Sequence, residues 1–152
     1  MSDTRMKKQF EHNGLKCEAI LTMMGHYCGY VSVPKEHPWF GVSYSDKVIV
    51  PEAVMSRPID VDKVGAINLF CTTLTDEDKE ANRLDLVLAV DVHGGLTYAG
   101  ADGDLWQFGF DCAHAGDARF PGDPNGVWRD EAYVVGECKS LADQLVAVTV
   151  TT

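Results

Sequence analysis

An alternating run in the last third of the chain constrains the fold most strongly. In LWQFGFDCA, residues 105–113, the aromatic side chains of Trp106, Phe108 and Phe110 occupy every second position. Successive side chains of a β-strand point to opposite faces of its sheet, so these three share one face, which must be buried. The residues between them share the other face: Gln107, Gly109 and Asp111. The run therefore predicts a strand with one face in the core.

The residues before this run predict its partner strand. The segment from Leu84 to Gly100 is rich in β-prone residues and is interrupted by a bend or bulge at Gly94-Gly95. It leads into the turn ADGD, in which Gly103 supplies a positive φ. Alternation within the segment predicts one face made of Leu88, Val90 and Val92 and another made of Ala89, Asp91 and His93. Together the two runs predict a hairpin that turns around Gly103.

The N-terminal third predicts another hairpin. LKCEAILTM, residues 15–23, and YCGYVSVP, residues 27–34, are β-prone runs separated by a turn at Gly25. The loop at 35–46 carries four aromatic side chains, which we expect to pack back on the sheet rather than grip a ligand: His37, Trp39, Phe40 and Tyr44. Periodicity leaves residues 51–74 ambiguous between strand and helix.

One helix is expected, over residues 129–148. Apolar residues recur there at steps of four, three and four, which is the spacing of a helix with one buried face: Val134, Cys138, Leu141 and Leu145. Asp130 and Glu131 in its first turn suit the helix dipole. The expected architecture is a single domain, residues 1–152, of α+β class. Its mainly antiparallel sheet is built from two hairpins, and the C-terminal amphipathic helix packs on one face.

Composition excludes several functions. With 13 basic and 23 acidic residues the net charge is −10, which opposes direct binding to nucleic acid phosphates. No apolar run approaches the roughly 20 residues of a membrane span. The first fourteen residues lack the apolar stretch of a signal peptide, so a cytoplasmic location is expected. The five cysteines include no C-x-x-C pair, which favours free and mostly buried thiols over a zinc ribbon.

Polar side chains gather where the second hairpin ends. If the hairpin pairs around Gly103, DVHGGLTY (residues 91–98) approaches FDCAHAGD (residues 110–117) at one end of the sheet. Glycines there would let a ligand come close to the backbone. The residues expected to bind a ligand at this end are His93, Thr97, Tyr98, Asp111, His114 and Asp117.

Four interpretations of this cluster compete. Histidine, aspartate and cysteine on an extended segment suit a metal site, although no standard ligand spacing is present. His114, oriented by Asp111 or Asp117, suits acid/base chemistry. The same groups with exposed glycine amides suit a phosphate- or ribose-bearing small molecule. Alternatively, His114 and Asp117 only bond the backbone and cap the following loop. Cys112 continues the core face of the strand, so we expect it to be a buried, inert thiol.

Four blocks of the sequence resemble a known group of proteins: GYVSVPKEHPWFG, VHGGLTYAG, WQFGFDCAHAGD and RDEAYVVGECKSLADQL. In this order they are similar to small uncharacterised proteins encoded by bacteriophages and prophages, over most of the chain from Cys28 to Leu145. The resemblance implies a phage accessory protein that acts in the bacterial cytoplasm and is not part of the virion shell. Such a protein would counter host defence by holding or degrading a nucleotide signal, or by blocking a host protein.

The leading hypothesis is therefore a phage accessory protein that binds a small nucleotide-like ligand through the six residues above. Its expected role is to counter host defence. The first alternative is a hydrolase that uses the same cluster, with or without a divalent metal. The second is an acidic protein–protein inhibitor of a host factor, with Trp39 and Phe40 as anchors. The expected partner is a small molecule or a host protein; the sequence assigns no cofactor, catalytic residue or oligomeric state.

Overall fold

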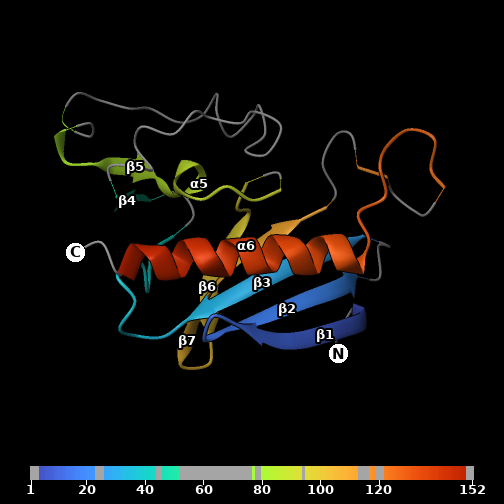
Figure 1. Ribbon diagram of the computed structural model, residues 1–152, viewed down its shortest axis with the longest axis horizontal. Coiled ribbons are helices and arrows are strands. Elements are labelled where there is room, and N and C mark those ends of the chain that lie inside the picture. Colours follow the sequence, from blue (N-terminus) through green and yellow to red (C-terminus); the bar gives the residue numbers. More distant parts are fainter. Residues whose placement is uncertain are drawn as a thin grey trace.

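The main sheet has five antiparallel strands in a computed structural model that describes residues 4–22, 26–43, 46–51, 77, 80–93, 95–112, 117–118 and 122–149 (Figure 1). The strands lie in the spatial order β1-β2-β3-β7-β6. Their bounds are β1 Thr4–His12, β2 Leu15–Thr22, β3 Tyr27–Val33, β6 Tyr98–Asp102 and β7 Leu105–Asp111. A separate antiparallel pair is formed by β4 (Lys47–Ile49) and β5 (Arg83–Asp85).

Both predicted hairpins are present. β2 pairs with β3, and β6 pairs with β7 across a turn in which Gly103 has a φ of +59°. The structure joins the two hairpins by pairing β3 with β7, so that Val31 faces Phe108 across the ladder. The turn expected at Gly25, residues 52–74 of the ambiguous segment, and Tyr44 lie outside the described residues.

The N-terminal strand β1 was not predicted. It joins β2 through Asn13 and Gly14, whose φ angles are +53° and +82°. Asn-Gly is the residue pair that most favours a two-residue hairpin turn, because both central positions of that turn need a positive φ. The sequence carried this signal, and the sheet therefore contains a three-stranded meander where one hairpin was expected.

The prediction of a strand over Leu84–His93 is wrong. The segment contains β5 and a one-turn helix, α5 (Leu86–Ala89), and continues as irregular chain to β6. Leu86, Ala89 and Val90 are all buried, and their spacing is that of a helical face. A continuous apolar run meets both the strand and the helix pattern, so alternation could not decide between them.

The C-terminal helix α6 (Glu131–Thr149) confirms the helix prediction. Its first turn is capped by Asp130, whose Oδ1 accepts a hydrogen bond from the backbone N–H of Tyr133 at 2.9 Å. The helix lies across one face of the sheet and contacts β2 and β3 (Figure 1). The architecture is thus α+β, with a mainly antiparallel sheet and one C-terminal helix packed on it.

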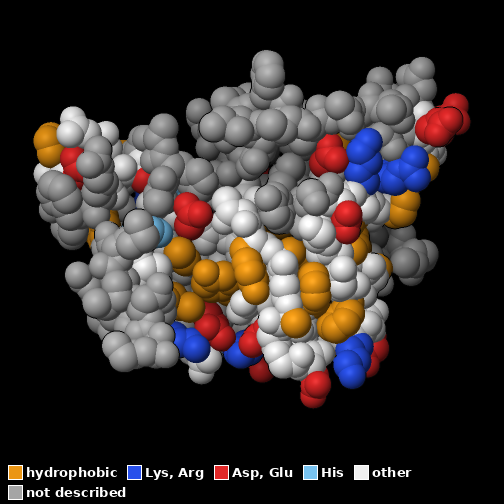
Figure 2. Space-filling view, turned by 180° about the vertical axis from the view of Figure 1, so that it is seen from behind, with side chains coloured by type: hydrophobic (Ala, Val, Ile, Leu, Met, Phe, Trp, Pro, Cys, Tyr) orange, Lys and Arg blue, Asp and Glu red, His pale blue; other side chains and the backbone are white. Residues whose placement is uncertain are grey.

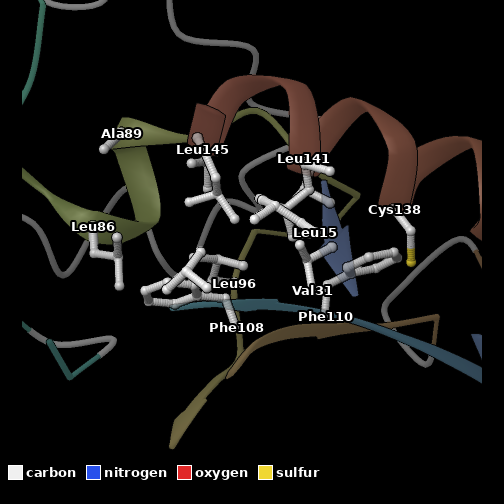
Figure 3. Close-up of a cluster of buried hydrophobic side chains, with 14 of the residues drawn as sticks. Leu15, Val31, Leu86, Ala89, Leu96, Phe108, Phe110, Cys138, Leu141 and Leu145 are labelled. Carbon is white, nitrogen blue, oxygen red and sulfur yellow. The ribbon is translucent and has the colours of Figure 1, made fainter. Parts of the chain in front are cut away.

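The core lies between α6 and the sheet. Leu141, Leu145 and Cys138 point from the helix toward the sheet, where Phe108 and Phe110 of β7 meet them (Figure 3). All five side chains are fully buried, and burial of each large apolar side chain contributes roughly 1.5–3 kcal/mol. Within the described residues, no helix has both the length and the apolar character of a membrane span.

The aromatic loop after β3 packs back on the molecule, as predicted. Trp39 is only 2% exposed, and its indole N–H donates to the carbonyl of Ile49 at 3.3 Å. His37 is also buried, and burial lowers its pKa. Its Nε2–H donates to the carbonyl of Leu145 at 2.7 Å, while Nδ1 accepts from the N–H of Trp39. A buried Trp39 is not available as the anchor of a protein–protein inhibitor.

Candidate functional site

The structure divides the six predicted site residues between the two faces of the sheet. His93 and Asp117 meet on the face that α6 covers. Asp111 points to the opposite face, together with Tyr98, and Thr97 Oγ1 lies 3.3 Å from Asp111 Oδ2. His114 lies outside the described residues. The single pocket expected from the sequence is therefore replaced, among the described residues, by two separate groups of side chains.

The first group is centred on the imidazole of His93. Its Nε2 lies 2.9 Å from Asp117 Oδ2, and its Nδ1 lies 2.9 Å from the hydroxyl of Tyr133 in the first turn of α6. The backbone N–H of His93 donates to Glu137 Oε1 at 2.8 Å, one turn further along the helix. The histidine side chain is 10% exposed. These bonds fix the irregular chain before β6 against the start of α6.

Asp117 connects this group to Arg129. The carboxylate is 3% exposed and accepts from Arg129 Nε at 3.0 Å through Oδ1, while Oδ2 faces His93. The guanidinium carbon of Arg129 lies 4.8 Å from the centre of the Tyr133 ring, which is a cation–π distance. We call His93, Asp117, Arg129 and Tyr133 the relay cluster.

The tautomer of His93 follows from its partners. A carboxylate can only accept, so Nε2 carries the proton toward Asp117. Burial raises the pKa of Tyr133, and the nearby Glu137 raises it further, so the phenol is protonated at neutral pH. In the Nε2–H tautomer of the imidazole, Nδ1 is unprotonated and accepts a hydrogen bond from Tyr133 O–H. The result is a directed chain of hydrogen bonds from phenol to imidazole to carboxylate.

A glycine positions Asp117 in this chain. Asp117 and Val127 form an isolated bridge, and Ala118 N–H donates to the carbonyl of Val127 at 2.8 Å. A Cβ at Gly126 would lie 2.5 Å from the carbonyl carbon of Asp117, so only glycine allows this crossing of two backbone segments. The loop at 122–130 thereby holds the carboxylate against His93.

Cys112 does not join either group as a reactive thiol. It is 2% exposed, and burial raises its pKa far above the usual range, so the thiolate is suppressed. All four cysteines in the described part of the chain are free and buried: Cys17, Cys28, Cys112 and Cys138. This confirms the expectation of buried thiols at these positions; Cys71 lies outside the described residues.

The second group lies on the sheet face away from α6, which we call the open face. Figure 2 views this side and shows hydrophobic side chains gathered on it, with charged side chains beside them. Tyr30 of β3 lies across Gly109 of β7, because a Cβ at Gly109 would lie 2.6 Å from two carbons of the Tyr30 ring. The ring of Tyr98 passes over Gly100 in the same way. The two glycines thus make room for two tyrosine rings against the backbone.

The two tyrosines form a corner. Their ring centres are 5.9 Å apart and their planes meet at 85°. Both rings lie against the sheet backbone, and Tyr98 is 42% exposed. Burial raises the pKa of Tyr30 to about 12, so its ring stays neutral. Asp111 and Thr97 lie beside the Tyr98–Gly109 pair, at the end of the β6–β7 ladder. We call Tyr30, Tyr98, Thr97 and Asp111 the tyrosine corner.

The other half of the open face is ionic. Lys16 Nζ lies 3.2 Å from both Glu18 Oε1 and Asp102 Oδ2, and Lys7 Nζ lies 3.3 Å from Glu18 Oε2. Hydrogen bonds to Glu18 and Asp102 raise the pKa of Lys16. Both lysines are therefore matched by carboxylates, and this half offers little net positive charge to a phosphate.

Sequence reasoning missed four participants in these groups. Tyr30 was placed correctly on a strand, but its contact with Tyr98 depends on the pairing of β3 with β7, which local patterns do not encode. Arg129, Tyr133 and Glu137 were not identified as candidate site residues. The spacing of Tyr133 and Glu137 at four residues, which places them on one side of the helix, was the available signal for these two.

The site geometry is the basis for assigning a function, because no similar protein supplies one. Comparison of the chain with protein family models, with curated proteins and with solved structures finds no match. Among the residues that the structure describes, no three histidine, cysteine, aspartate or glutamate side chains are arranged to hold a metal ion. The phage origin implied by the sequence blocks stays a prediction.

Proposed function

We propose that the protein binds a small nucleoside-like molecule at the tyrosine corner of the open face. The observation that carries the proposal is the pair of tyrosine rings set at 85° over glycines. A planar base would lie against one ring and meet the edge of the other, and each stacking contact with an aromatic side chain contributes roughly 1–3 kcal/mol.

The negative charge of Asp111 at the tyrosine corner favours a nucleoside over a phosphate-bearing ligand. Asp111 presents carboxylate oxygens beside Thr97, and a carboxylate accepts hydrogen bonds from ribose hydroxyls or from the amino group of a base. The same carboxylate repels a phosphate, and the neighbouring lysines are already paired. The proposal therefore favours a nucleoside, or a nucleotide whose phosphates point away from the sheet. This narrows the nucleotide-like ligand expected from the sequence.

The biological context is part of the same proposal. The resemblance to phage-encoded proteins suggests a cytoplasmic accessory protein, and one that holds a nucleoside-like signal would withdraw it from host receptors. The acidic surface, with its net charge of −10, supports the exclusion of nucleic acid polymers from the corner.

Thermal unfolding with adenosine, guanosine, cytidine and uridine tests the proposal. At 100 times its Kd a ligand adds roughly 2.7 kcal/mol to the free energy of unfolding. For a chain of this length that raises Tm by about 5–10 °C. We expect at least one nucleoside to do so, and its 5′-triphosphate to bind no more tightly. If none of the four nucleosides or their triphosphates raises Tm, the proposal fails.

Three variants locate the site. Tyr98→Ala removes the exposed ring, Gly109→Ala displaces the Tyr30 ring, and Asp111→Asn removes the charge while keeping the shape. Each is expected to weaken nucleoside binding by about tenfold or more, as the loss of one stacking or charged contact implies. Ile49→Ala, at an exposed position on β4, is the control and should leave the Kd unchanged. Unchanged binding by Tyr98→Ala would place the ligand elsewhere.

A further inference from the structure

The relay cluster has the geometry of a nucleophile with its base, and it lies on the other face of the sheet from the tyrosine corner. The phenol oxygen of Tyr133 lies 2.9 Å from His93 Nδ1, and His93 Nε2 lies 2.9 Å from Asp117 Oδ2. A hydroxyl, an imidazole and a carboxylate in this order are the parts by which a weak hydroxyl nucleophile is activated. Here the hydroxyl belongs to a tyrosine.

We propose that Tyr133 is a nucleophile for phosphoryl esters, with His93 as its general base. The role of Asp117 is to position His93: it holds the Nε2–H tautomer, so that the lone pair of Nδ1 is aimed at the phenol. It also stabilises the imidazolium that forms when His93 takes the proton. Arg129 in turn fixes the carboxylate through Oδ1.

Arg129 indicates the substrate class. Its Nε–H is used by Asp117, and its Cζ lies 4.8 Å from the centre of the Tyr133 ring. The guanidinium is therefore held over the face of the Tyr133 ring, with four more N–H donors on Nη1 and Nη2. A planar guanidinium fixed in this way suits the oxygens of a phosphoryl group, on which negative charge is spread during transfer. Its side chain is 26% exposed, so solvent-borne esters can reach it.

The transfer balances without a further reactant. The Tyr133 oxygen forms a bond to phosphorus while its proton passes to His93 Nδ1. The bond from phosphorus to the leaving alcohol breaks on the opposite side of phosphorus, and the alkoxide takes a proton from solvent. Water then attacks the phosphotyrosine from that side and gives a proton to solvent, while the imidazolium returns the Tyr133 proton to the departing phenolate. The net reaction is hydrolysis of the ester.

An aryl sulfonyl fluoride tests the proposal, because its tetrahedral sulfur stands in for phosphorus and it needs no knowledge of the natural substrate. Attack by Tyr133 forms a sulfonate ester and releases fluoride, with the phenol proton taken by His93. We expect peptide mass mapping to show Tyr133 modified at least about tenfold faster than Tyr98, although Tyr98 is 42% exposed. If, in the protein without substitutions, Tyr98 is labelled faster than Tyr133, the labelling rate follows solvent exposure and the proposal is overturned.

A variant separates chemistry from structure. His93→Gln should lower the rate at Tyr133 by about tenfold or more, in line with loss of a general base. The rate at Tyr98 should not change. Tyr27 is buried at 6% exposure and reports on unfolding, since its modification would rise in a variant that loses its fold. If His93→Gln keeps Tyr27 protected and labels Tyr133 at the original rate, His93 is not its base and the proposal fails.

Discussion

Replacing Phe110 with alanine is expected to lower the free energy of unfolding by about 3–5 kcal/mol, the range found when a buried aromatic side chain is truncated. Phe110 is 1% exposed, and it lies between β7 and α6 beside Cys138 (Figure 3). Its ring also covers Gly29 of β3, so its loss opens a cavity between two strands and the helix. Urea denaturation monitored by circular dichroism measures the change.

An exposed position provides the control for this variant. Ile49→Ala removes apolar atoms from a side chain that is 59% exposed and should change stability by less than about 0.5 kcal/mol. A cost below about 1 kcal/mol for Phe110→Ala would contradict the placement of this residue at the centre of the core.

Gly29→Ala is expected to be the next most damaging change, at about 1–3 kcal/mol. A Cβ at this position would overlap the ring of Phe110 and lie 2.8 Å from Cys138 Sγ. The ring has no room to retreat, because it is packed against α6. Gly29 is therefore needed for the close packing of the helix on β3, and the effect is steric rather than conformational. The same urea titration measures it.

A double-mutant cycle isolates the steric cause. Phe110→Leu removes the ring atoms that the new methyl would meet, so Gly29→Ala should cost less in that background than in the original protein. We expect a coupling of about 0.5–3 kcal/mol in the favourable direction. Strictly additive effects would show that Gly29→Ala acts through the backbone and not through Phe110.

The parts of the fold that could be predicted are those that local pattern specifies. Helix α6 followed from apolar residues at helical spacing, and β7 followed from its alternating aromatics. The Leu86–Val90 run could not be assigned by pattern, because a fully apolar segment fits helix and strand alike. The pairing of β3 with β7 joins residues about 80 positions apart, and no local signal sets that register.

The sequence located some of the residues of the two groups but not their arrangement. His93 and Asp117 do meet, as the hairpin geometry suggested. The prediction did not allow for the irregular chain before β6, which carries His93 to the helix side while Asp111 stays on the open face. The partners Tyr133 and Arg129 come from α6 and the chain before it, and only tertiary packing brings them to His93. The sequence therefore located the polar segments, but it did not show that their side chains are divided between the two faces of the sheet.

Amide chemical-shift mapping tests the proposal that the open face binds the ligand. Uniformly ¹⁵N-labelled protein is titrated with whichever of the four nucleosides raises Tm most. The largest shifts are expected at Tyr30, Tyr98, Gly100 and Gly109, and Tyr98→Ala is expected to abolish them. Shifts that centre instead on His93 and the first turns of α6 would contradict the proposal, because the ligand would then lie on the helix side of the sheet.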